Sequence, residues 1–373
     1  MSVGLYHIIC RMAPVSRNKI VFSNFLGRGF GDNPKYIAEE IIRRNLPYDL
    51  VWLVENLDEK VPEGIRKVKI YTRKCRWELA TARIIVSNVK SGLPFQKKKG
   101  QFYLQTWHGD FPLKYIEKEA VSSLPATYVR DSQIDSSITD LVLSGNRFFS
   151  GIVRNSFWYS GEILEKGLPR NDIFFRAPEA VSRKVYSAFQ LPPDNRILLY
   201  APTFRGLDKP LPELDIKAVR EALERISGGG WSILFRLHSV DRGRDVGALL
   251  RDGGIDASEY PDMQELERAS HLLITDYSSL MYDFALQGKP VVLYTPDVEE
   301  YASGRGLRPL FYDLPFLRSL DRKGLEVALE EALSAESLGK CASFFENEIC
   351  PVESGHSSEA VVDRIQHFVE NHE

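Results

Sequence analysis

A single histidine stands at the end of an apolar, strand-forming run. His108 lies in the segment QTWHGD (105–110), which directly follows the run FYL (102–104). Loops at the carboxyl ends of strands often carry catalytic groups, and histidine exchanges a proton near neutral pH. This pattern predicts acid–base chemistry at His108. The alternative is a hydrogen-bonded structural histidine packed beside Trp107.

A second candidate site combines a buried strand, a polar turn and two hydroxyl side chains. In the segment ITDYSSL (274–280), Asp276 begins the turn, and Ser278 and Ser279 begin the expected helix. The backbone N–H groups at a helix start and nearby hydroxyls bind anions such as phosphate. The segment therefore predicts a phosphate site. An ordinary serine cap is the alternative.

Two further strand ends in the same half of the chain carry cations. Arg236 and His238 lie two residues apart, so strand alternation places both side chains on one side of the sheet. Arg205 ends the segment APTFR (201–205) after another apolar strand. The three side chains suit an anionic ligand, although a surface salt bridge is an equally simple explanation for Arg205.

Other nucleotide-site motifs are absent from the sequence. The run GRGFG (27–31) lets the backbone approach a ligand closely, but it does not match the dinucleotide pattern GxGxxG. No D-x-D pair, P-loop or G-x-S-x-G segment occurs, which argues against metal–nucleotide carboxylate pairs, kinases, ATPases and serine hydrolases. No metal site and no cofactor are expected.

Strand-like and helix-like segments alternate along the whole chain, which predicts an α/β fold with largely parallel sheets. Expected strands cover 19–22, 50–54, 84–87, a run ending near 106, 196–200, 232–237, 272–275 and 290–294. Expected helices cover 34–44, with Asp32 or Asn33 as its cap, then 76–81, 216–226, ending at the glycines 228–230, and 278–286.

Length and composition bound the organisation. At 373 residues, two domains are the default, and a polar, proline-containing stretch at 177–193 suggests a boundary. We expect an N-terminal domain over 1–182 and a C-terminal domain over 183–373. The last helix can also cross back from the C-terminal domain to pack on the N-terminal domain. The fold class expected is two Rossmann-like, doubly wound domains facing a cleft, which strand-end loops of both would line.

Charge and cysteine usage narrow the function classes. The net charge of −3 argues against bulk nucleic-acid binding. Four scattered cysteines indicate reduced thiols of a cytoplasmic protein, and no apolar run is long enough to span a membrane. The N-terminal segment 1–16 has no signal-peptide pattern, and either membrane-surface contact or packing onto the protein would explain its apolar cluster.

Five segments, taken together and in order, resemble the CDP-glycerol glycerophosphotransferase family, the teichoic-acid-type polyol-phosphate transferases. They are DNPKY (32–36), QTWHG (105–109), YAPTFR (200–205), RLH (236–238) and TDYSS (275–279). The resemblance covers most of the chain and implies a GT-B fold. Two segments depart from the family pattern: SGHSSE (354–359) matches its ending only in part, and LRPL (307–310) is less typical. The region after Tyr301 is a candidate for selecting the polyol of the donor.

The resemblance also implies roles for residues. The N-terminal domain would receive the acceptor, and the C-terminal domain would bind a CDP-activated donor. His108 would be the general base on the acceptor hydroxyl, and His238 would stabilise the donor phosphate. Expected donor phosphate contacts are Arg205, Arg236, Asp276, Ser278 and Ser279, and the expected acceptor-side loop residues are Gly27, Gly29, Gly31, Gly109 and Asp110.

The reaction implied is transfer of glycerol phosphate from CDP-glycerol to a hydroxyl of a polyprenyl-linked saccharide or polyol-phosphate acceptor, with release of CMP. The enzyme would work at the inner face of the cell membrane. CDP-ribitol is the alternative donor. A GT-B nucleotide-sugar glycosyltransferase or epimerase is the alternative reaction, and a non-enzymatic scaffold that binds a CDP-polyol is the alternative outside catalysis.

Overall fold

The computed structural model describes residues 3–90, 92–93, 95–176, 178–206, 209, 211–238, 241 and 244–371. The chain divides into two compact units. Unit 1 comprises Met1–Asp110, Ile116–Asp172 and Pro351–Glu373, and unit 2 comprises Phe111–Tyr115 and Ile173–Cys350. The polar stretch in which composition suggested a boundary contains the whole of helix α6 in unit 2; residue 177 lies outside the described residues.

Unit 1 is built on a seven-stranded parallel sheet with the order β3-β2-β1-β4-β5-β6-β7. Its strands are β1 (Lys19–Ser23), β2 (Asp49–Val54), β3 (Ile65–Lys69), β4 (Ile84–Ser87), β5 (Phe102–Gln105), β6 (Leu141–Ser144) and β7 (Glu162–Glu165). Its helices are α1 (Val3–Met12), α2 (Asp32–Arg43), α3 (Arg73–Thr81), η1 (Glu117–Ser123), α4 (Ala126–Ile138), α5 (Arg147–Ser156) and α15 (Ser357–Asn371), and η2 (Pro169–Phe174) leads into unit 2.

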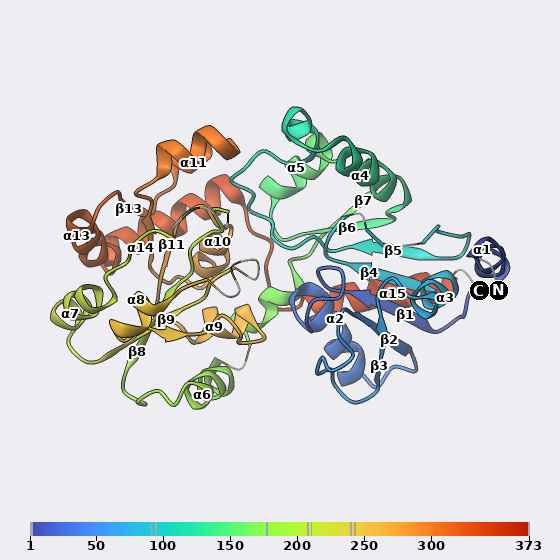
Figure 1. The fold of residues 1–373 in the computed structure, drawn as a ribbon, viewed down its shortest axis with the longest axis horizontal. Coiled ribbons are helices and arrows are strands. Elements are labelled where there is room, and N and C mark those ends of the chain that lie inside the picture. Colours follow the sequence, from blue (N-terminus) through green and yellow to red (C-terminus); the bar gives the residue numbers. More distant parts are fainter. Residues whose placement is uncertain are drawn as a thin grey trace. The chain divides into compact units, whose positions relative to one another are not determined.

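The last helix of the chain completes the core of unit 1. Helix α15 packs against α2 and lies among the elements of the first half of the chain, as its red ribbon shows in Figure 1. Its buried residues Val362 and Ile365 join Ile37 and Ile41 of α2 in one apolar cluster with the central strands. The central strands are buried along almost their whole length because helices cover both faces of a parallel sheet.

Unit 2 is built on a six-stranded parallel sheet with the order β10-β9-β8-β11-β12-β13. Its strands are β8 (Arg196–Tyr200), β9 (Trp231–Phe235), β10 (Ile255–Asp256), β11 (Leu272–Thr275), β12 (Val291–Tyr294) and β13 (Leu317–Ser319). Its helices are α6 (Pro178–Ala188), α7 (Ile216–Ser227), α8 (Gly247–Arg251), α9 (Met263–Ala269), α10 (Leu280–Ala285), α11 (Val298–Arg305), α12 (Leu310–Asp313), α13 (Arg322–Ala332), α14 (Ala335–Phe344) and η4 (Phe345–Ile349).

Several helix and strand boundaries differ from those expected. Helix α2 has Gly31 as its N-cap, without a side-chain cap hydrogen bond, so the expected cap at Asp32 or Asn33 is wrong. Strand β9 ends at Phe235, before the two cations predicted to lie on it. Helix α10 begins only at Leu280, so both serines lie in the preceding turn. By contrast, α7 ends at Ser227, directly before Gly228, as predicted.

Candidate active site

The loop after β5 carries His108 at the carboxyl end of the unit 1 sheet. Trp107 adopts a left-handed backbone with φ of 55°, which turns the chain sharply before the histidine. The His108 ring packs 4.5 Å from the Trp107 ring and 5.5 Å from the Phe25 ring, measured between centroids. A strained conformation at a bulky residue persists only where its surroundings hold it, and such residues cluster at functional sites. The His108 ring thus packs against two aromatic side chains, those of Trp107 and Phe25.

One hydrogen bond decides which nitrogen of His108 is available. Nδ1 lies 2.8 Å from the carbonyl oxygen of Asn88, and a carbonyl can only accept, so Nδ1 carries the proton. In the neutral ring, Nε2 then has an unshared electron pair. Burial lowers the pKa of His108 below its ordinary value, against the opposing effect of the Asn88 carbonyl, so the ring is neutral at pH 7. These are the properties of a general base.

The side chain of Asn88 joins the loop after β4 to the loop after β1. Its Nδ2 donates to Asn24 Oδ1 at 2.8 Å, and its Oδ1 accepts from the Phe25 N–H at 2.8 Å. Asn24 in turn donates to the Arg28 carbonyl at 2.7 Å. The backbone carbonyl that fixes the His108 tautomer is thus held by buried amides. The residue type of Asn88 alone could not indicate this role.

The glycine-rich loop packs closely on its neighbour. Gly27 has φ of 96°, and a Cβ there would lie 2.8 Å from the Glu55 nitrogen. Gly29 has φ of 74° with open space around it, and Gly31 precedes helix α2. This arrangement explains the glycines by backbone geometry. Their predicted contact with the acceptor stays a prediction.

Arg170 and Asp32 support the His108 loop from the other side. Arg170 Nη1 donates to Asp32 Oδ2 at 3.0 Å and to the His108 carbonyl oxygen at 2.9 Å. The amide of Asn33 donates to the Trp107 carbonyl at 3.1 Å and accepts from the Arg170 N–H at 3.1 Å. Both Asp32 and Asn33 belong to a segment that carried the family resemblance. No local signal pointed to Arg170, because its partners are distant in sequence.

Gly109 and Asp110 follow the histidine and are buried. The Asp110 carbonyl accepts from Asn146 Nδ2 at 3.0 Å. A Cβ added at Gly145 would lie 2.2 Å from Asp110 Oδ2 and 2.4 Å from Glu353 Oε1, so these two carboxylates are close neighbours within unit 1. Asp110 therefore lies in the polar interior beside the segment that leads into α15.

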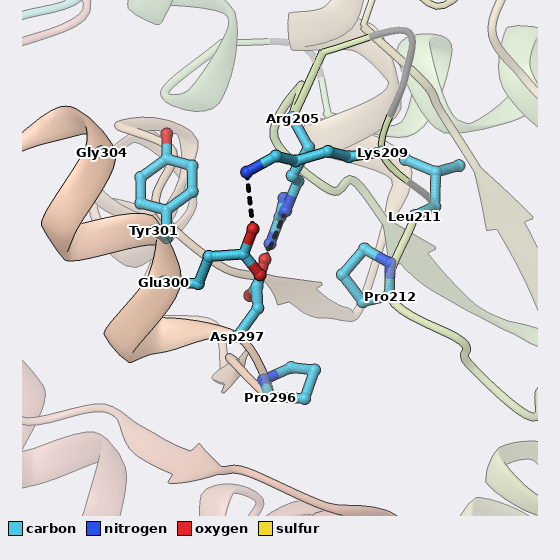
Figure 2. Close-up of a pocket in the computed structure, with 9 residues that line it drawn as sticks. All are labelled: Arg205, Lys209, Leu211, Pro212, Pro296, Asp297, Glu300, Tyr301 and Gly304. Atoms are coloured by element: carbon cyan, nitrogen blue, oxygen red, sulfur yellow. Dashed lines mark hydrogen bonds and ion pairs between the residues drawn. The ribbon is translucent and has the colours of Figure 1, made fainter.

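In unit 2, Arg205 is held by two carboxylates. It forms an ion pair with Asp276, and its Nε and Nη2 bond the Asp297 carboxylate at 3.0 and 3.2 Å (Figure 2). Its side chain is only 4% exposed. Although burial opposes it, the attraction of Asp276 and Asp297 raises the pKa of Arg205. The charge of the predicted phosphate ligand Arg205 is thus already balanced within unit 2.

Asp276 connects two strand-end loops. Its carboxylate accepts from the Thr203 N–H at 2.9 Å and from the Tyr277 N–H at 2.6 Å, in addition to the ion pair with Arg205. A carboxylate cannot donate to a phosphate, and these contacts use its acceptor capacity. The Asp276 carboxylate therefore connects the loops after β8 and β11.

Arg236 and His238 follow β9 in a loop, so the expected strand alternation does not apply to them. Arg236 Nη1 donates to the Ala257 carbonyl at 3.2 Å. The exposed ring of His238 stacks against Phe204, with centroids 5.9 Å apart. Since Phe204 adjoins Arg205, two of the predicted donor-side segments meet at this contact.

The two serines lie between β11 and α10. Ser278 Oγ accepts from the Leu280 N–H at 3.3 Å, and Ser279 is the N-cap without a side-chain cap hydrogen bond. Both are partly exposed. Their place after a buried strand agrees with the predicted phosphate site. The helix that follows them, α10, is only six residues long. Phosphate binding at the serines stays a prediction.

The described part of the chain holds no group of three or more histidine, cysteine or acidic side chains arranged to bind a metal ion. All four cysteines are free thiols.

Comparison with known proteins decides the family. Residues 5–367 match the family described as CDP-Glycerol:Poly(glycerophosphate) glycerophosphotransferase. The chain belongs to this family. The resemblance inferred from the five segments is thereby confirmed.

Two relatives match nearly all of the chain. A teichoic acid poly(glycerol phosphate) polymerase of Staphylococcus epidermidis is 31% identical over 97% of this chain and 52% of its own length. One from Bacillus spizizenii is 28% identical over 97% of this chain and 96% of its own length. The chain thus spans about half of the first relative and almost all of the second.

Solved structures agree with the predicted fold. The wall teichoic acid polymerase TagF matches with a TM-score of 0.87 and 30% identity, covering 98% of this chain and 93% of that one. A Staphylococcus aureus MnaA–UDP structure matches with a TM-score of 0.54 at 13% identity, covering 95% and 97% of the two chains, which concerns the fold alone. The predicted GT-B-like α/β fold of two Rossmann-like units is confirmed.

Proposed function

We propose that this family member transfers glycerol phosphate from CDP-glycerol to a hydroxyl of a lipid-linked or polymeric teichoic-acid-type acceptor and releases CMP. Family membership supports the reaction class, and a TagF variant soaked with CDPG supports the donor. The single observation that carries the mechanism is the Nδ1–Asn88 hydrogen bond of His108. It leaves Nε2 as the only ring nitrogen able to accept a proton.

In the proposed mechanism, the acceptor hydroxyl loses its proton to His108 Nε2 as its oxygen attacks the phosphorus that carries glycerol. The new oxygen–phosphorus bond forms as the bond to the CMP oxygen breaks, and CMP leaves as an anion. Such reactions depend on alignment and charge stabilisation more than on covalent chemistry. Arg170 and Asp32 would hold the loop that positions the base.

Unit 2 would bind the donor. We propose His238, Arg236, Ser278 and Ser279 as its phosphate contacts. Asp276 and Arg205 would act by holding the loops that carry the contacts, since their opposite charges are paired with each other and Arg205 also bonds the Asp297 carboxylate. A hydrogen bond from the His238 ring would stabilise the phosphate charge that develops during transfer.

A donor screen tests the proposal. The purified protein is incubated with CDP-glycerol, CDP-ribitol or UDP-sugars together with a glycerol-phosphate-primed lipid acceptor, and CMP release and product mass are measured. We expect CMP release and a mass increase of one or more glycerol-phosphate units only with CDP-glycerol. No CMP release from any CDP-polyol contradicts the proposal.

CDP-ribitol remains the second donor candidate because a relative supports it. A Bacillus spizizenii teichoic acid poly(ribitol-phosphate) polymerase is 24% identical over 98% of this chain. The poly(glycerol phosphate) relatives are more similar, at 28–31%. In the donor screen, a mass increase of ribitol-phosphate units would select this candidate.

We further propose that the protein works peripherally at the inner face of the cell membrane through helix α1. Leu5, Ile8 and Met12 of α1 are 50%, 56% and 80% exposed, and Arg11 lies in its last turn. On another side of the helix, Tyr6 donates to the Arg73 carbonyl at 2.7 Å. A helix with an exposed apolar face beside cations suits a lipid interface. None of the described helices is long and apolar enough to cross a membrane.

A further inference from the structure

A cavity in unit 2 lies at the carboxyl ends of β8 and β12, and among the predicted phosphate contacts only Arg205 lines it. Its volume is about 260 Å³. It is lined by Arg205, Lys209, Leu211, Pro212, Pro296, Asp297, Glu300, Tyr301 and Gly304, which Figure 2 shows around the space between α11 and the loop after β8. Pockets for whole drug-sized ligands occupy roughly 300–1,000 Å³, so this one suits a small part of a ligand.

The charges of the cavity do not favour phosphate. Arg205 is balanced by Asp276 and Asp297. The second cation, Lys209, pairs with Glu300 at 2.6 Å. Together the two cations face three carboxylates, and a phosphate group placed here would be repelled by the excess negative charge.

The remaining acceptor capacity suits neutral hydroxyl groups. Asp297 is held by Arg205 and by the Tyr277 hydroxyl, which donates at 2.9 Å. Although burial opposes them, these hydrogen bonds keep the pKa of Asp297 below its ordinary value, so it is ionised at neutral pH. Glu300 is 65% exposed and is reached from solvent. Carboxylates accept hydrogen bonds from hydroxyls, and Lys209 can donate to a hydroxyl oxygen.

The walls of the cavity also suit a short polyol. Leu211, Pro212 and Pro296 line one side with apolar atoms, and Tyr301 contributes the other side. Tyr301 is fixed by stacking on Tyr277, with centroids 3.7 Å apart and planes 11° apart. Carbon-bound hydrogens of a polyol would face the apolar side while its hydroxyls meet the charged groups.

We propose that this cavity binds a vicinal diol of the donor through Glu300. The inference rests on the proposed function, because it assumes a CDP-polyol as ligand. A CDP-polyol contains two sources of a vicinal diol, the ribose of its nucleotide and the polyol itself. Either diol presents two adjacent hydroxyls that can donate hydrogen bonds to a carboxylate. Because a diol is neutral, it needs no additional charged residue to bind.

Isothermal titration of CDP-glycerol and of CMP against wild type and Glu300→Gln tests the assignment. Replacing a charged acceptor by a neutral one is expected to weaken a bound hydroxyl contact about 10-fold. Weaker CDP-glycerol binding with unchanged CMP binding identifies the glycerol as the diol. Equal weakening of both ligands identifies the ribose.

Glu299→Gln is the matched control, because Glu299 is an exposed residue of the same helix that does not line the cavity. Thermal unfolding should be unchanged in both variants, since an exposed ion pair contributes little stability. Unchanged affinity of Glu300→Gln for both ligands, or equal weakening by Glu299→Gln, overturns the subsite. A wild-type protein that neither binds CDP-glycerol nor releases CMP from it contradicts the proposed function instead.

Discussion

At the scale of single residues, His108 combines a fixed tautomer with a lowered pKa. The Asn88 carbonyl holds the proton on Nδ1, and burial keeps the ring neutral. A base must be unprotonated before it can act, so both effects increase the fraction of protein able to react at pH 7. The same hydrogen bond becomes stronger once the ring is charged, which stabilises the product of proton transfer.

His108→Ala removes the proposed base. We expect turnover to fall by a factor on the order of 100 to 10,000, with donor affinity unchanged, because the predicted donor contacts lie in unit 2. Steady-state kinetics and titration with CDP-glycerol measure the two effects. His356→Ala, at an exposed histidine of the same unit, is the control and should retain turnover. Full activity of the His108 variant would remove this residue from the mechanism.

The pH profile of kcat/KM should reflect the lowered pKa of His108. Activity is lost as pH falls through this pKa, because the ring becomes protonated, so the acid limb should lie below pH 6.5. The negative charge of Asp32 raises the pKa of His108, and Asp32→Asn should therefore move the limb to still lower pH. Asparagine also tolerates the left-handed backbone of this position, where φ is 54°. A limb that moves to higher pH would contradict the assignment.

At the scale of elements, the predicted functional groups come from loops at the carboxyl ends of parallel strands. In unit 1 the loops after β1, β4 and β5 are joined through Asn24, Asn88 and His108. In unit 2 the loops after β8, β11 and β12 are joined through Arg205 and its two carboxylates. Side chains bond the loops to one another, so the position of each loop depends on its neighbours.

Gly27 and Gly29 offer a matched test of close packing in the loop after β1. Both have positive φ, so alanine should strain either position by about 1 kcal/mol. Only Gly27→Ala also places a methyl group against backbone atoms of Val54 and Glu55, which should add about 1–3 kcal/mol. Urea denaturation measures the free energy of unfolding of both variants. Equal losses of unfolding free energy in the two variants would show that the loop moves freely away from β2.

Helix α1 supplies the test of membrane contact. Ile8→Glu places a charge on the exposed apolar face and should reduce sedimentation with anionic liposomes severalfold. Val327→Glu, at a residue equally exposed in unit 2, should leave sedimentation unchanged. Equal binding by wild type and Ile8→Glu would reject α1 as the contact.

At the scale of the whole molecule, the chain leaves unit 1 after residue 172 and returns to it at residue 351. Asp172 accepts from the backbone N–H groups of Ser357 and Ser358 at 2.8 Å each, so it caps α15 from a distant part of the sequence. Glu353 accepts from the Leu168 N–H at 3.0 Å and from Asn171 at 2.9 Å. These contacts tie the final segment to the end of the first.

Asp172→Ala should weaken the attachment of α15 to the rest of unit 1. Loss of a capping carboxylate costs about 1–2 kcal/mol, and we expect faster hydrogen exchange in α15 before global unfolding. Ser334→Ala removes the cap of α14 in unit 2 and should leave exchange in α15 unchanged. Unaltered exchange in Asp172→Ala would show that the apolar contacts with α2 hold α15 alone.

Local sequence patterns were sufficient to predict most of the central strands. They were not sufficient to predict the strands at the edges of the two sheets. Most central strands were predicted, because parallel strands buried on both faces form apolar runs. The exception is β6, a buried four-residue strand inside the unit 1 sheet, which was not predicted. Strands β3 and β7 were missed because they lie at the edges of the sheet and carry charged residues, and β10 and β13 are too short for a clear signal.

The sequence by itself determined the family and the fold class, because short motifs and residue periodicity are local properties of the chain. Only the tertiary structure decided what His108 contacts. Its tautomer depends on Asn88 and its loop on Arg170, and both lie in other segments. It also decided that Arg205 bonds Asp276 and Asp297. Hydrogen bonds and ion pairs join groups that folding brings together, and no spacing along the chain encodes which partners meet.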